Sequence, residues 1–545
     1  MLSCGRSLVG PGSLLLLAAA AEAQVGTVLR AHRIDALDGL LEHDDYLGQS
    51  LALLGDLDGD GLPELAVGAT HQVDFTEVND EAGAVWILFL RADGTVRSFT
   101  EIGRGTGGFT GALPDAALFG SSLEALGDLD GDGRSELGVI SFEPNPSAPN
   151  RAPIGTHLWI LFLDASGQVR RHARIDHTDP VFQPPIDGRD LFGLAGSLGD
   201  TDGDGLPDVA LGSSGDDTGP GADAGAFWVL RLNADGSARS ALKIGRAEVP
   251  IEAEDRFGNR VSRLGDIDRD GFEELAVSSF GADGGTGSVW ILSLRPDQTV
   301  ADALELDGAA FELDDSKSGV ASIGDLDGDR VPEVVVTLPD YFTGQPPRDV
   351  GGLMVAFLAP NGSVRKRLVI TRNRNGLTIP LPQGTGFGRE VEFLGDLDKD
   401  GNPELATGGI YFDDEEGTLW ILSLRGSPVR EGRGVNPVVL RQKADPEIGR
   451  TWRAALDCRG HAPGLALLGI HPSPLGGVLV PGGELLVAGA PLALFQQAHA
   501  GTQVRFDVLV PPLVALVHRP LHAQGACTGA PGPRLSNALD LLVGR

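Results

Sequence analysis

Basic residues, cysteine and long apolar runs are all scarce in this chain of 545 residues. Lys and Arg number 43 against 76 Asp and Glu, which gives a formal net charge of −33. This balance argues against a nucleic acid or an anionic membrane as the partner, because a phosphate-binding surface needs clustered Lys and Arg. The excess of carboxylates favours a polyvalent cation instead.

Beyond the N-terminus, no apolar stretch is long enough to span a bilayer. The N-terminus itself has a lone basic Arg6, an apolar run at residues 14–21 and a small-x-small sequence, Ala21-Glu22-Ala23. These features predict a secretory signal peptide at residues 1–23. We expect the mature chain to be soluble and monomeric, and to be secreted or held at the cell surface or in the periplasm.

Removal of this segment would leave two of the three cysteines, Cys458 and Cys527. An even pair in an oxidising compartment predicts a disulfide in the C-terminal region. A zinc site is the alternative, since His461 and His471 lie near Cys458, but no second close-spaced pair completes a ligand set.

Short catalytic and adhesion motifs are also absent. The sequence has no H-E-x-x-H, no G-x-S-x-G and no R-G-D, and its 11 histidines are scattered. The triplet Asp314-x-Ser316-x-Ser318 matches a metal-binding pattern of doubly wound adhesion domains. No α/β pattern surrounds it, so we interpret that match as chance.

Glycine, proline and repetition characterise what is present. With 78 Gly, 35 Pro and few helix-length amphipathic stretches, the chain favours many short strands joined by turns. Its length exceeds the size at which a single core stops growing, so internal repeats are expected. The predicted class is all-β.

An acidic loop, D-x-D-x-D-x-x-x-[DE], occurs six times, at intervals of 72, 72, 66, 59 and 71 residues. Such a period fits one four-stranded propeller blade per repeat. Carboxylates at positions 1, 3, 5 and 9 and a backbone carbonyl at position 7 offer the oxygen shell that Ca²⁺ prefers, and glycine at position 6 permits a sharp turn. An EF-hand is excluded, because position 12 holds no glutamate. The predicted ligands are Asp56, Asp58, Asp60, Leu62 and Glu64; Asp128, Asp130, Asp132, Arg134 and Glu136; Asp200, Asp202, Asp204, Leu206 and Asp208; Asp266, Asp268, Asp270, Phe272 and Glu274; Asp325, Asp327, Asp329, Val331 and Glu333; and Asp396, Asp398, Asp400, Asn402 and Glu404.

Most repeats open with an aromatic-glycine pair such as Phe119-Gly120, and an apolar strand follows each loop. This combination resembles the FG-GAP repeat of integrin alpha-chain propellers over about residues 25–425. The resemblance implies that each loop lies in the hairpin between a blade's first two strands and binds Ca²⁺. A later strand carries one large apolar residue in each repeat, which we expect to pack between blades: Trp86, Trp159, Trp228, Trp290, Met354 and Trp420.

The repeats depart from the integrin pattern in number and in the fifth copy. Integrin propellers have seven repeats, whereas this chain has six. The fifth has no aromatic residue before Gly319, and Arg330 replaces the loop glycine. A left-handed conformation costs a residue such as Arg about 1–2 kcal/mol. We therefore predict that the fifth loop is the weakest calcium site.

The sixth repeat lacks a final strand, while residues 28–34 have the pattern of a final strand with nothing before it. Pairing between the two would build one sheet from both ends of the repeat region and close a ring. The prediction is a six-bladed β-propeller.

Acidic loops stop at about residue 436, where the composition turns to Pro, Gly, Leu and Val. The predicted organisation is a propeller at residues 24–426, a linker at 427–435 and a small β-sandwich at 436–545 with strands at 464–470, 484–488, 503–510 and 513–518. A degenerate seventh blade is the alternative, since residues 484–491 end in a literal Gly489-Ala490-Pro491.

The leading functional hypothesis is a non-enzymatic scaffold that binds an extracellular protein or a glycan. The calcium loops would lie on one face, and the long variable loops on the opposite face, where binding usually resides. Tyr341-Phe342 and Tyr411-Phe412 are candidate contacts there. An extracellular polysaccharide lyase or hydrolase, with catalytic groups in the central channel, is the alternative.

Overall fold

The computed structural model describes residues 25–34, 46–70, 82–145, 147, 153–182, 192–217, 223–281, 287–307, 311, 319–339, 350–382, 384–409 and 417–426. Beyond these it describes ten short C-terminal ranges, which coincide with strands. Every named element in the described chain is a β-strand, so the all-β class is confirmed. No helix in these ranges is long and apolar enough to cross a membrane.

Six antiparallel sheets of four strands each form the larger part of the described chain. Five of them are built from consecutive strands. Their bounds are β2 (Leu51–Gly55), β3 (Glu64–Ala69), β4 (Ala84–Leu90) and β5 (Val96–Ile102); β6 (Leu123–Gly127), β7 (Glu136–Pro144), β8 (Pro153–Leu163) and β9 (Val169–Asp176); β10 (Gly193–Gly199), β11 (Asp208–Ser213), β12 (Ala226–Leu232) and β13 (Ala238–Ile244); β14 (Phe257–Gly265), β15 (Glu273–Ser279), β16 (Ser288–Leu294) and β17 (Val300–Leu306); and β18 (Gly319–Ser322), β19 (Val334–Leu338), β20 (Gly352–Leu358) and β21 (Val364–Ile370).

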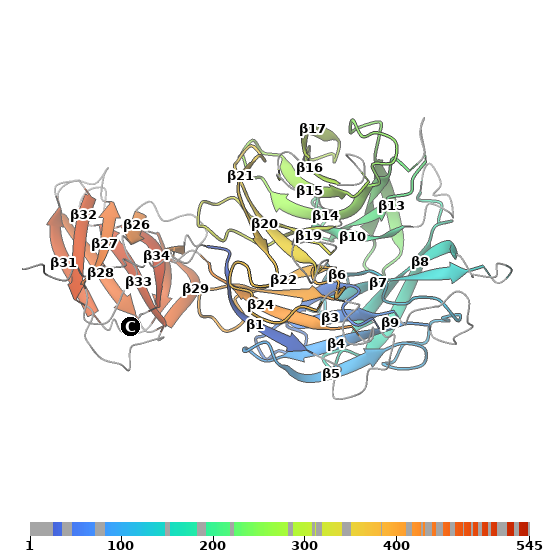
Figure 1. Cartoon of the computed structure of the whole chain (residues 1–545), viewed down its shortest axis with the longest axis horizontal. Coiled ribbons are helices and arrows are strands. Elements are labelled where there is room, and N and C mark those ends of the chain that lie inside the picture. Colours follow the sequence, from blue (N-terminus) through green and yellow to red (C-terminus); the bar gives the residue numbers. More distant parts are fainter. Residues whose placement is uncertain are drawn as a thin grey trace, which may run out of the picture.

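The sixth sheet joins distant parts of the chain. It consists of β22 (Val391–Gly395), β23 (Glu404–Gly408), β24 (Leu419–Leu424) and, on its outer edge, β1 (Val28–Ile34). β1 runs antiparallel to β24, with Val28 opposite Leu424 and Ile34 opposite Leu419. The predicted pairing of the N-terminal strand with the last repeat is therefore present (Figure 1).

The first strands of the six sheets contact one another in a ring: β2 with β6, β6 with β10, β10 with β14, β14 with β18, β18 with β22, and β22 with β2. The sheets radiate from these inner strands, as in a propeller (Figure 1). β5, β9, β13, β17, β21 and β1 are the outermost strands.

Apolar contacts between neighbouring sheets form the core. The six predicted packing residues, Trp or Met, are at most 6% exposed. Trp228, for example, lies in one apolar cluster with residues of the preceding sheet, and its ring packs edge-on against Phe182 at 5.5 Å between ring centroids. These residues therefore pack between sheets, as predicted.

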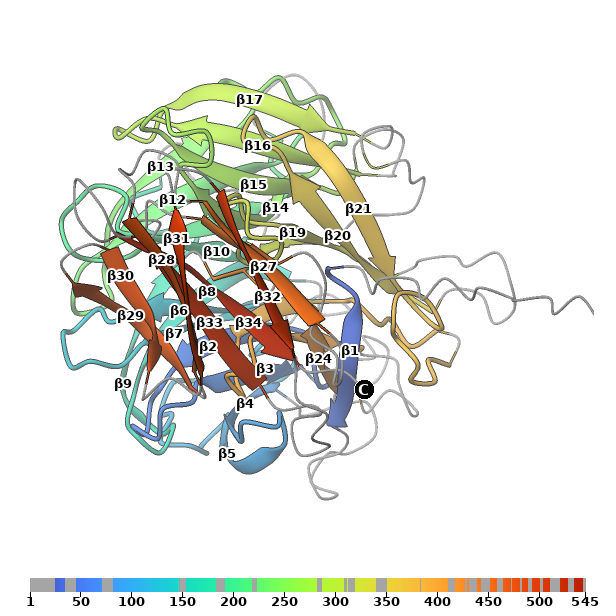
Figure 2. The same ribbon diagram turned by 90° about the vertical axis from the view of Figure 1, so that its left-hand side faces the viewer.

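The C-terminal region forms three further sheets, which lie to one side of the propeller sheets in Figure 1 and in front of them in Figure 2. A sheet of five strands has the order β25-β34-β33-β28-β31, one of three has the order β26-β27-β32, and β29 pairs with β30. Their bounds are β25 (Val429–Arg430), β26 (Val439–Gln442), β27 (Thr451–Asp457), β28 (Gly464–His471), β29 (Ser473–Val480), β30 (Gly483–Ala488), β31 (Ala493–His499), β32 (Gln503–Leu509), β33 (Pro520–Cys527) and β34 (Arg534–Leu542).

Three predictions can be compared with the structure of this region. The predicted linker contains a strand, β25, which pairs with β34. β30, the strand of the seventh-blade alternative, pairs with β29, and no described propeller strand pairs with it. Cys527 is buried and disulfide-bonded, and its partner lies outside the described residues.

Several other predictions fall outside the described residues. They are the signal peptide at 1–23, the triplet of Asp314, Ser316 and Ser318, the strand at 513–518, Cys458 and His461, and the two Tyr-Phe pairs at 341–342 and 411–412.

Candidate metal centre

Each acidic loop lies in the hairpin between the first and second strands of its sheet. The first loop, for example, begins after β2 and ends with Glu64 at the start of β3. All six loops therefore lie at the same end of the inner strands. This is the location that the resemblance to FG-GAP repeats implies.

Backbone amides hold the carboxylates of each loop in place. In the first loop, Asp56 accepts hydrogen bonds from the backbone N–H of Gly59 at 2.7 Å and of Gly61 at 2.9 Å. Asp58 Oδ1 accepts from the N–H of Asp60, and Asp60 Oδ1 from the N–H of Leu62 at 2.9 Å. Each of these aspartates is thereby fixed in orientation, and the Oδ2 atoms of Asp58 and Asp60 accept no backbone bond among those described.

The carboxylate at position 9 is buried and only half satisfied. Glu64 is 0% exposed, and its Oε2 accepts from the N–H of Leu57 at 2.6 Å, but its Oε1 has no hydrogen-bond partner. A buried oxygen without a partner is costly, so it points to a missing ligand. The same orphaned oxygen occurs in five loops, on Glu64, Glu136, Asp208, Glu333 and Glu404.

Burial also shifts the titration of these groups. Burial, with a smaller effect of the neighbouring aspartates, raises the pKa of Glu64, Glu136 and Glu404 to about 7 and that of Glu333 to about 8. A cation beside the carboxylates would favour their ionised form and remove this cost. The donor set of carboxylate oxygens fits a hard divalent cation such as Ca²⁺.

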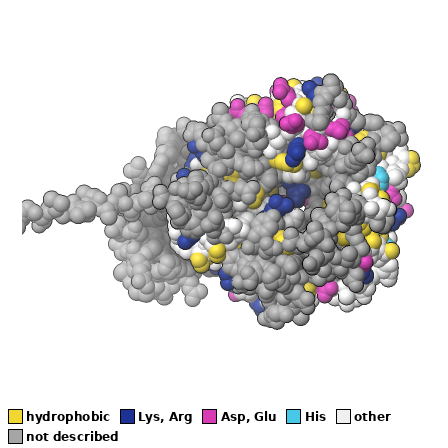
Figure 3. Space-filling model, turned by 45° about the vertical axis from the view of Figure 1, so that its right-hand side comes forward, with side chains coloured by type: hydrophobic (Ala, Val, Ile, Leu, Met, Phe, Trp, Pro, Cys, Tyr) yellow, Lys and Arg dark blue, Asp and Glu magenta, His cyan; other side chains and the backbone are white. Residues whose placement is uncertain are grey.

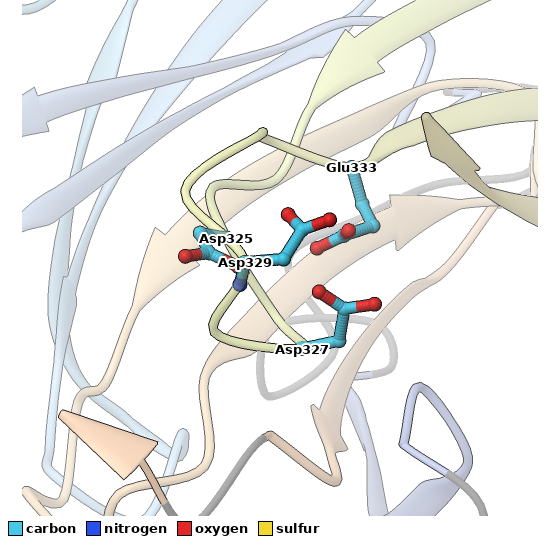
Figure 4. Close-up of side chains that lie close together, drawn as sticks. All are labelled: Asp325, Asp327, Asp329 and Glu333. Atoms are coloured by element: carbon cyan, nitrogen blue, oxygen red, sulfur yellow. Dashed lines mark hydrogen bonds between the residues drawn. The ribbon is translucent and has the colours of Figure 1, made fainter. Parts of the chain in front are cut away.

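The fifth loop gathers all four of its carboxylates (Figure 4). Oxygens of Asp325, Asp327, Asp329 and Glu333 lie within 4.8 Å of one another. Arg330, which replaces the loop glycine, has a φ of 75°, so the left-handed conformation expected there is present. The loop closes despite this strain, and its relative calcium affinity stays a prediction.

Two further loops carry a left-handed residue that was not predicted from the sequence. Arg269 in the fourth loop has a φ of 67°, and Lys399 in the sixth a φ of 59°. Both stand at position 4, where the other four loops have glycine. Three of the six loops therefore contain a non-glycine residue in this strained region.

An arginine from the outermost strand contacts five of the loops, which the sequence analysis did not predict. Arg365 on β21, for example, lies 3.1 Å from Asp327 and 2.6 Å from Asp329. The contacting arginines are Arg30, Arg97, Arg170, Arg239 and Arg365. Four of them are the second residue of their strand, a recurrence that was visible in the sequence.

A cavity of about 570 Å³ lies at the axis of the ring, at the opposite end of the inner strands from the loops. Figure 3 shows a hollow on one face of the molecule with Lys and Arg side chains inside it. All six sheets contribute to the cavity. Residues at or just before their inner strands line it, namely Gln49, Ser122, Gly193, Arg260, Gly319 and Glu390.

Further charged groups lie on the inner strands near this cavity. Arg260 forms an ion pair with Glu390, with 3.2 Å between Nε and Oε2, and donates from Nη1 to the carbonyl of Leu194 at 3.0 Å. Burial raises the pKa of Glu124 to about 7 and, with the charges of Glu124 and Glu390, raises that of Glu392 well above its usual range. Arg260 and Glu390 are 130 residues apart in the sequence, so no short motif reveals their ion pair.

Comparison with known proteins agrees with the repeat pattern. A family model described as FG-GAP repeat matches residues 47–88 and 192–230, so the chain contains FG-GAP repeats. Integrin alpha-PS2 of Drosophila melanogaster is 30% identical over 173 residues, which are 31% of this chain and 11% of that protein. Integrin alpha-3 of Cricetulus griseus is 30% identical over 173 residues, 31% of this chain and 14% of that protein.

This chain therefore matches only a small part of the length of these relatives. A solved structure of BBS1N in complex with ARL6DN aligns with 74% of this chain and 94% of that chain, at 10% identity and a TM-score of 0.34. That score is too low for the likeness to carry an argument.

Proposed function

We propose that this FG-GAP repeat protein is a calcium-stabilised propeller that acts outside the cell as a non-enzymatic scaffold for an extracellular protein or a glycan. The observation that carries the calcium assignment is the orphaned, fully buried carboxylate oxygen beside the aspartates in five of the loops. Similarity to integrin alpha chains supports the role in binding, and the predicted signal peptide supports the location.

Calcium would be held by the carboxylates at positions 1, 3, 5 and 9 and the backbone carbonyl at position 7 of each loop, which are the ligands predicted from the sequence. The propeller at residues 24–426 would be the calcium-dependent unit. The disulfide of Cys527 would stabilise the C-terminal sheets independently of the metal.

Ligand binding would occur at the end of the ring that is remote from calcium. The axial cavity opens there, and the connections between second and third strands leave from the same end. Rigid sheets that present variable loops around a cavity are a common arrangement for recognition. Arg389 and Glu390 at the rim offer charged groups to a polar ligand.

Removal of calcium tests the metal assignment. Binding at 100 times the dissociation constant stabilises the folded state by about 2.7 kcal/mol per site. EDTA should therefore lower the melting temperature of the full chain, and added Ca²⁺ should restore it. An unchanged melting curve and unchanged protease resistance in EDTA would refute the assignment.

Single loops can be tested by counting ions. Asp200→Ala and Asp204→Ala, made separately in the third loop, should each bind one calcium ion fewer than the wild type in a calorimetric titration. Asp235→Asn is the matched control, because Asp235 lies in a tight turn of the same sheet outside the loop. Loss of an ion in the control, or none in the loop variants, would contradict the proposal.

A glycan and protein binding array, run with and without calcium, tests the scaffold role. Binding without turnover is the expected result. Cleavage of a glycan would favour the enzyme alternative instead.

A further inference from the structure

The arginines on the outermost strands contact the oxygens that the loop backbone leaves free. In the first loop, Oδ1 of Asp58 and of Asp60 accept backbone N–H groups, as described above. Arg97 then pairs with Oδ2 of Asp58 and lies 2.8 Å from Oδ2 of Asp60. The guanidinium therefore stands where a cation ligated by these two aspartates would have to bind.

In the third loop, too, the aspartate Oδ1 atoms accept from backbone N–H groups and the Oδ2 atoms pair with an arginine. Oδ1 of Asp202 accepts from the N–H of Asp204 at 3.2 Å, and Oδ1 of Asp204 from that of Leu206 at 2.8 Å. Arg239 lies 2.8 Å from Oδ2 of Asp202 and also pairs with Oδ2 of Asp204.

Two more loops show how far the arginine reaches toward the buried carboxylate. In the fifth loop Arg365 approaches Oε1 of Glu333 to 4.0 Å, and in the sixth Arg30 approaches Oε1 of Glu404 to 3.8 Å. Both are orphaned oxygens. The arginine thus borders the whole acidic cluster without satisfying its deepest member.

The fourth loop differs. The second residue of β17 is Ala301, and the next is Asp302. Among the described residues, no basic side chain forms an ion pair with Asp268 or Asp270. A cavity of about 420 Å³ opens there, and its lining includes Asp268, Asp270 and Glu274. Arg295 also lines this cavity, but its guanidinium donates to Thr299 and to the carbonyl of Val300.

We propose that the outer-strand arginines compete with calcium for the loop carboxylates, so that the six sites differ in affinity and the fourth is the tightest. This inference rests on the calcium binding proposed above. Calcium must displace or reorient a guanidinium in five loops, which lowers the apparent affinity of each. In the fourth loop it displaces only the neutral Ser293 hydroxyl from Glu274 Oε1, which is a weaker partner for a carboxylate than a guanidinium.

The expected change in calcium affinity follows from the strength of ordinary ion pairs. Partly exposed pairs contribute about 0.2–1 kcal/mol each, and each arginine contacts two or more carboxylates. Removal of one arginine should therefore tighten its loop by about two- to thirty-fold. The same contacts neutralise part of the charge of a loop without calcium.

Calorimetric titration of the full chain with CaCl₂ tests this inference. The wild type should show one tight calcium ion, followed by weaker binding. Arg97→Met, which keeps the apolar stem of the side chain, should add a second tight ion. Ala301→Arg should remove the tight phase, and Asp268→Asn should do the same if that phase belongs to the fourth loop.

Arg91→Met is the matched control, because Arg91 lies in the turn between β4 and β5 and its guanidinium donates to Thr95 and to the carbonyl of Val96. It should leave the titration unchanged. Calcium binding that is alike in the wild type, Arg97→Met and Ala301→Arg would overturn the role of the arginines and leave the proposed function intact. No binding in any of these proteins would instead reject the proposed function.

Discussion

The carboxylate oxygens inside the acidic loops fall into two sets. One set of carboxylate oxygens ties the loop together through backbone amides, as at Asp56, while the other set converges on a common point. If the loop binds calcium as proposed, it would keep its shape while the ion exchanges. Its affinity depends on what else reaches that point.

Arg330 is held in a strained, left-handed conformation. Glycine adopts a φ of 75° without steric cost, so Arg330→Gly should raise the free energy of unfolding by about 1 kcal/mol and strengthen calcium binding by the fifth loop. Urea unfolding in EDTA and in Ca²⁺ measures both effects. Arg134→Gly, at a position without positive φ, is the control and should not stabilise. Equal effects at both sites would show that strain is not the cause.

Titration of Glu124 should make the free energy of unfolding depend on pH. Its pKa is raised from 4.5 to about 7 by burial, so the folded state holds an extra proton between these values. The stability that this proton contributes is complete below about pH 4.5 and is lost as the pH rises through 7. Glu124→Gln, which cannot ionise, should therefore gain stability relative to the wild type between pH 5 and pH 8, by about 1–3 kcal/mol.

Urea unfolding at both pH values measures this difference. Glu101→Gln serves as the control for the removal of a carboxylate, since Glu101 is exposed. A pH-independent offset for Glu124→Gln would contradict the buried titration.

At the scale of the element, the aromatic-glycine turn at the start of most repeats depends on close backbone approach. Phe119 is 0% exposed, and Gly120 follows it with a φ of 92°. A Cβ at Gly120 would lie 2.6 Å from the carbonyl oxygen of Ala84 in the neighbouring sheet. The turn therefore links one sheet to the next.

Gly120→Ala should cost about 1–3 kcal/mol more than Gly105→Ala. Gly105 is a fitting control, because it has a φ of 76° but nothing within 4 Å of its Cβ position, so it isolates the clash from the backbone strain. Thermal unfolding compares the two variants. Similar melting temperatures would mean that the sheets move apart without cost.

Hairpins and acidic loops could be predicted because their signals are local. Turn glycines such as Gly94 and Gly167 have the positive φ that their Asp-Gly and Ser-Gly sequences predict. The arginine contacts could not be predicted as easily, since Arg97 and Asp58 are 39 residues apart and only the sheet brings them together. The left-handed φ of Lys399 is not signalled by the residue itself, because lysine rarely adopts it, but glycine at the same position of four other loops does signal it.

For the whole molecule, closure depends on the contact between the two ends of the repeat region. Val28 and Ile34 are buried at the ends of β1, whereas Leu29 between them is 38% exposed. Ile34→Ala should therefore lower the free energy of unfolding by about 2–4 kcal/mol. Leu29→Ala should change it by no more than about 0.5 kcal/mol. Guanidinium unfolding measures both, and equal losses would mean that β1 does not hold the ring closed.

The closure of the ring could be predicted from the sequence. Residues 28–34 have the pattern of a strand without a partner, and the sixth repeat lacks its last strand. The C-terminal sheets were only partly predictable. β28, β30 and β32 coincide with predicted strands, but β25 lies in the predicted linker, since two residues are too few to carry a strand signal.

The pairing of β1 with β24 also sets an order of events during synthesis. Thr418 donates a hydrogen bond to the carbonyl of Ile34, 384 residues earlier in the chain. Strand β1 therefore stays unpaired during synthesis until β24 has left the ribosome. Until then each nascent intermediate is an open arc with an uncovered strand edge, so the ring can close only after synthesis has passed β24.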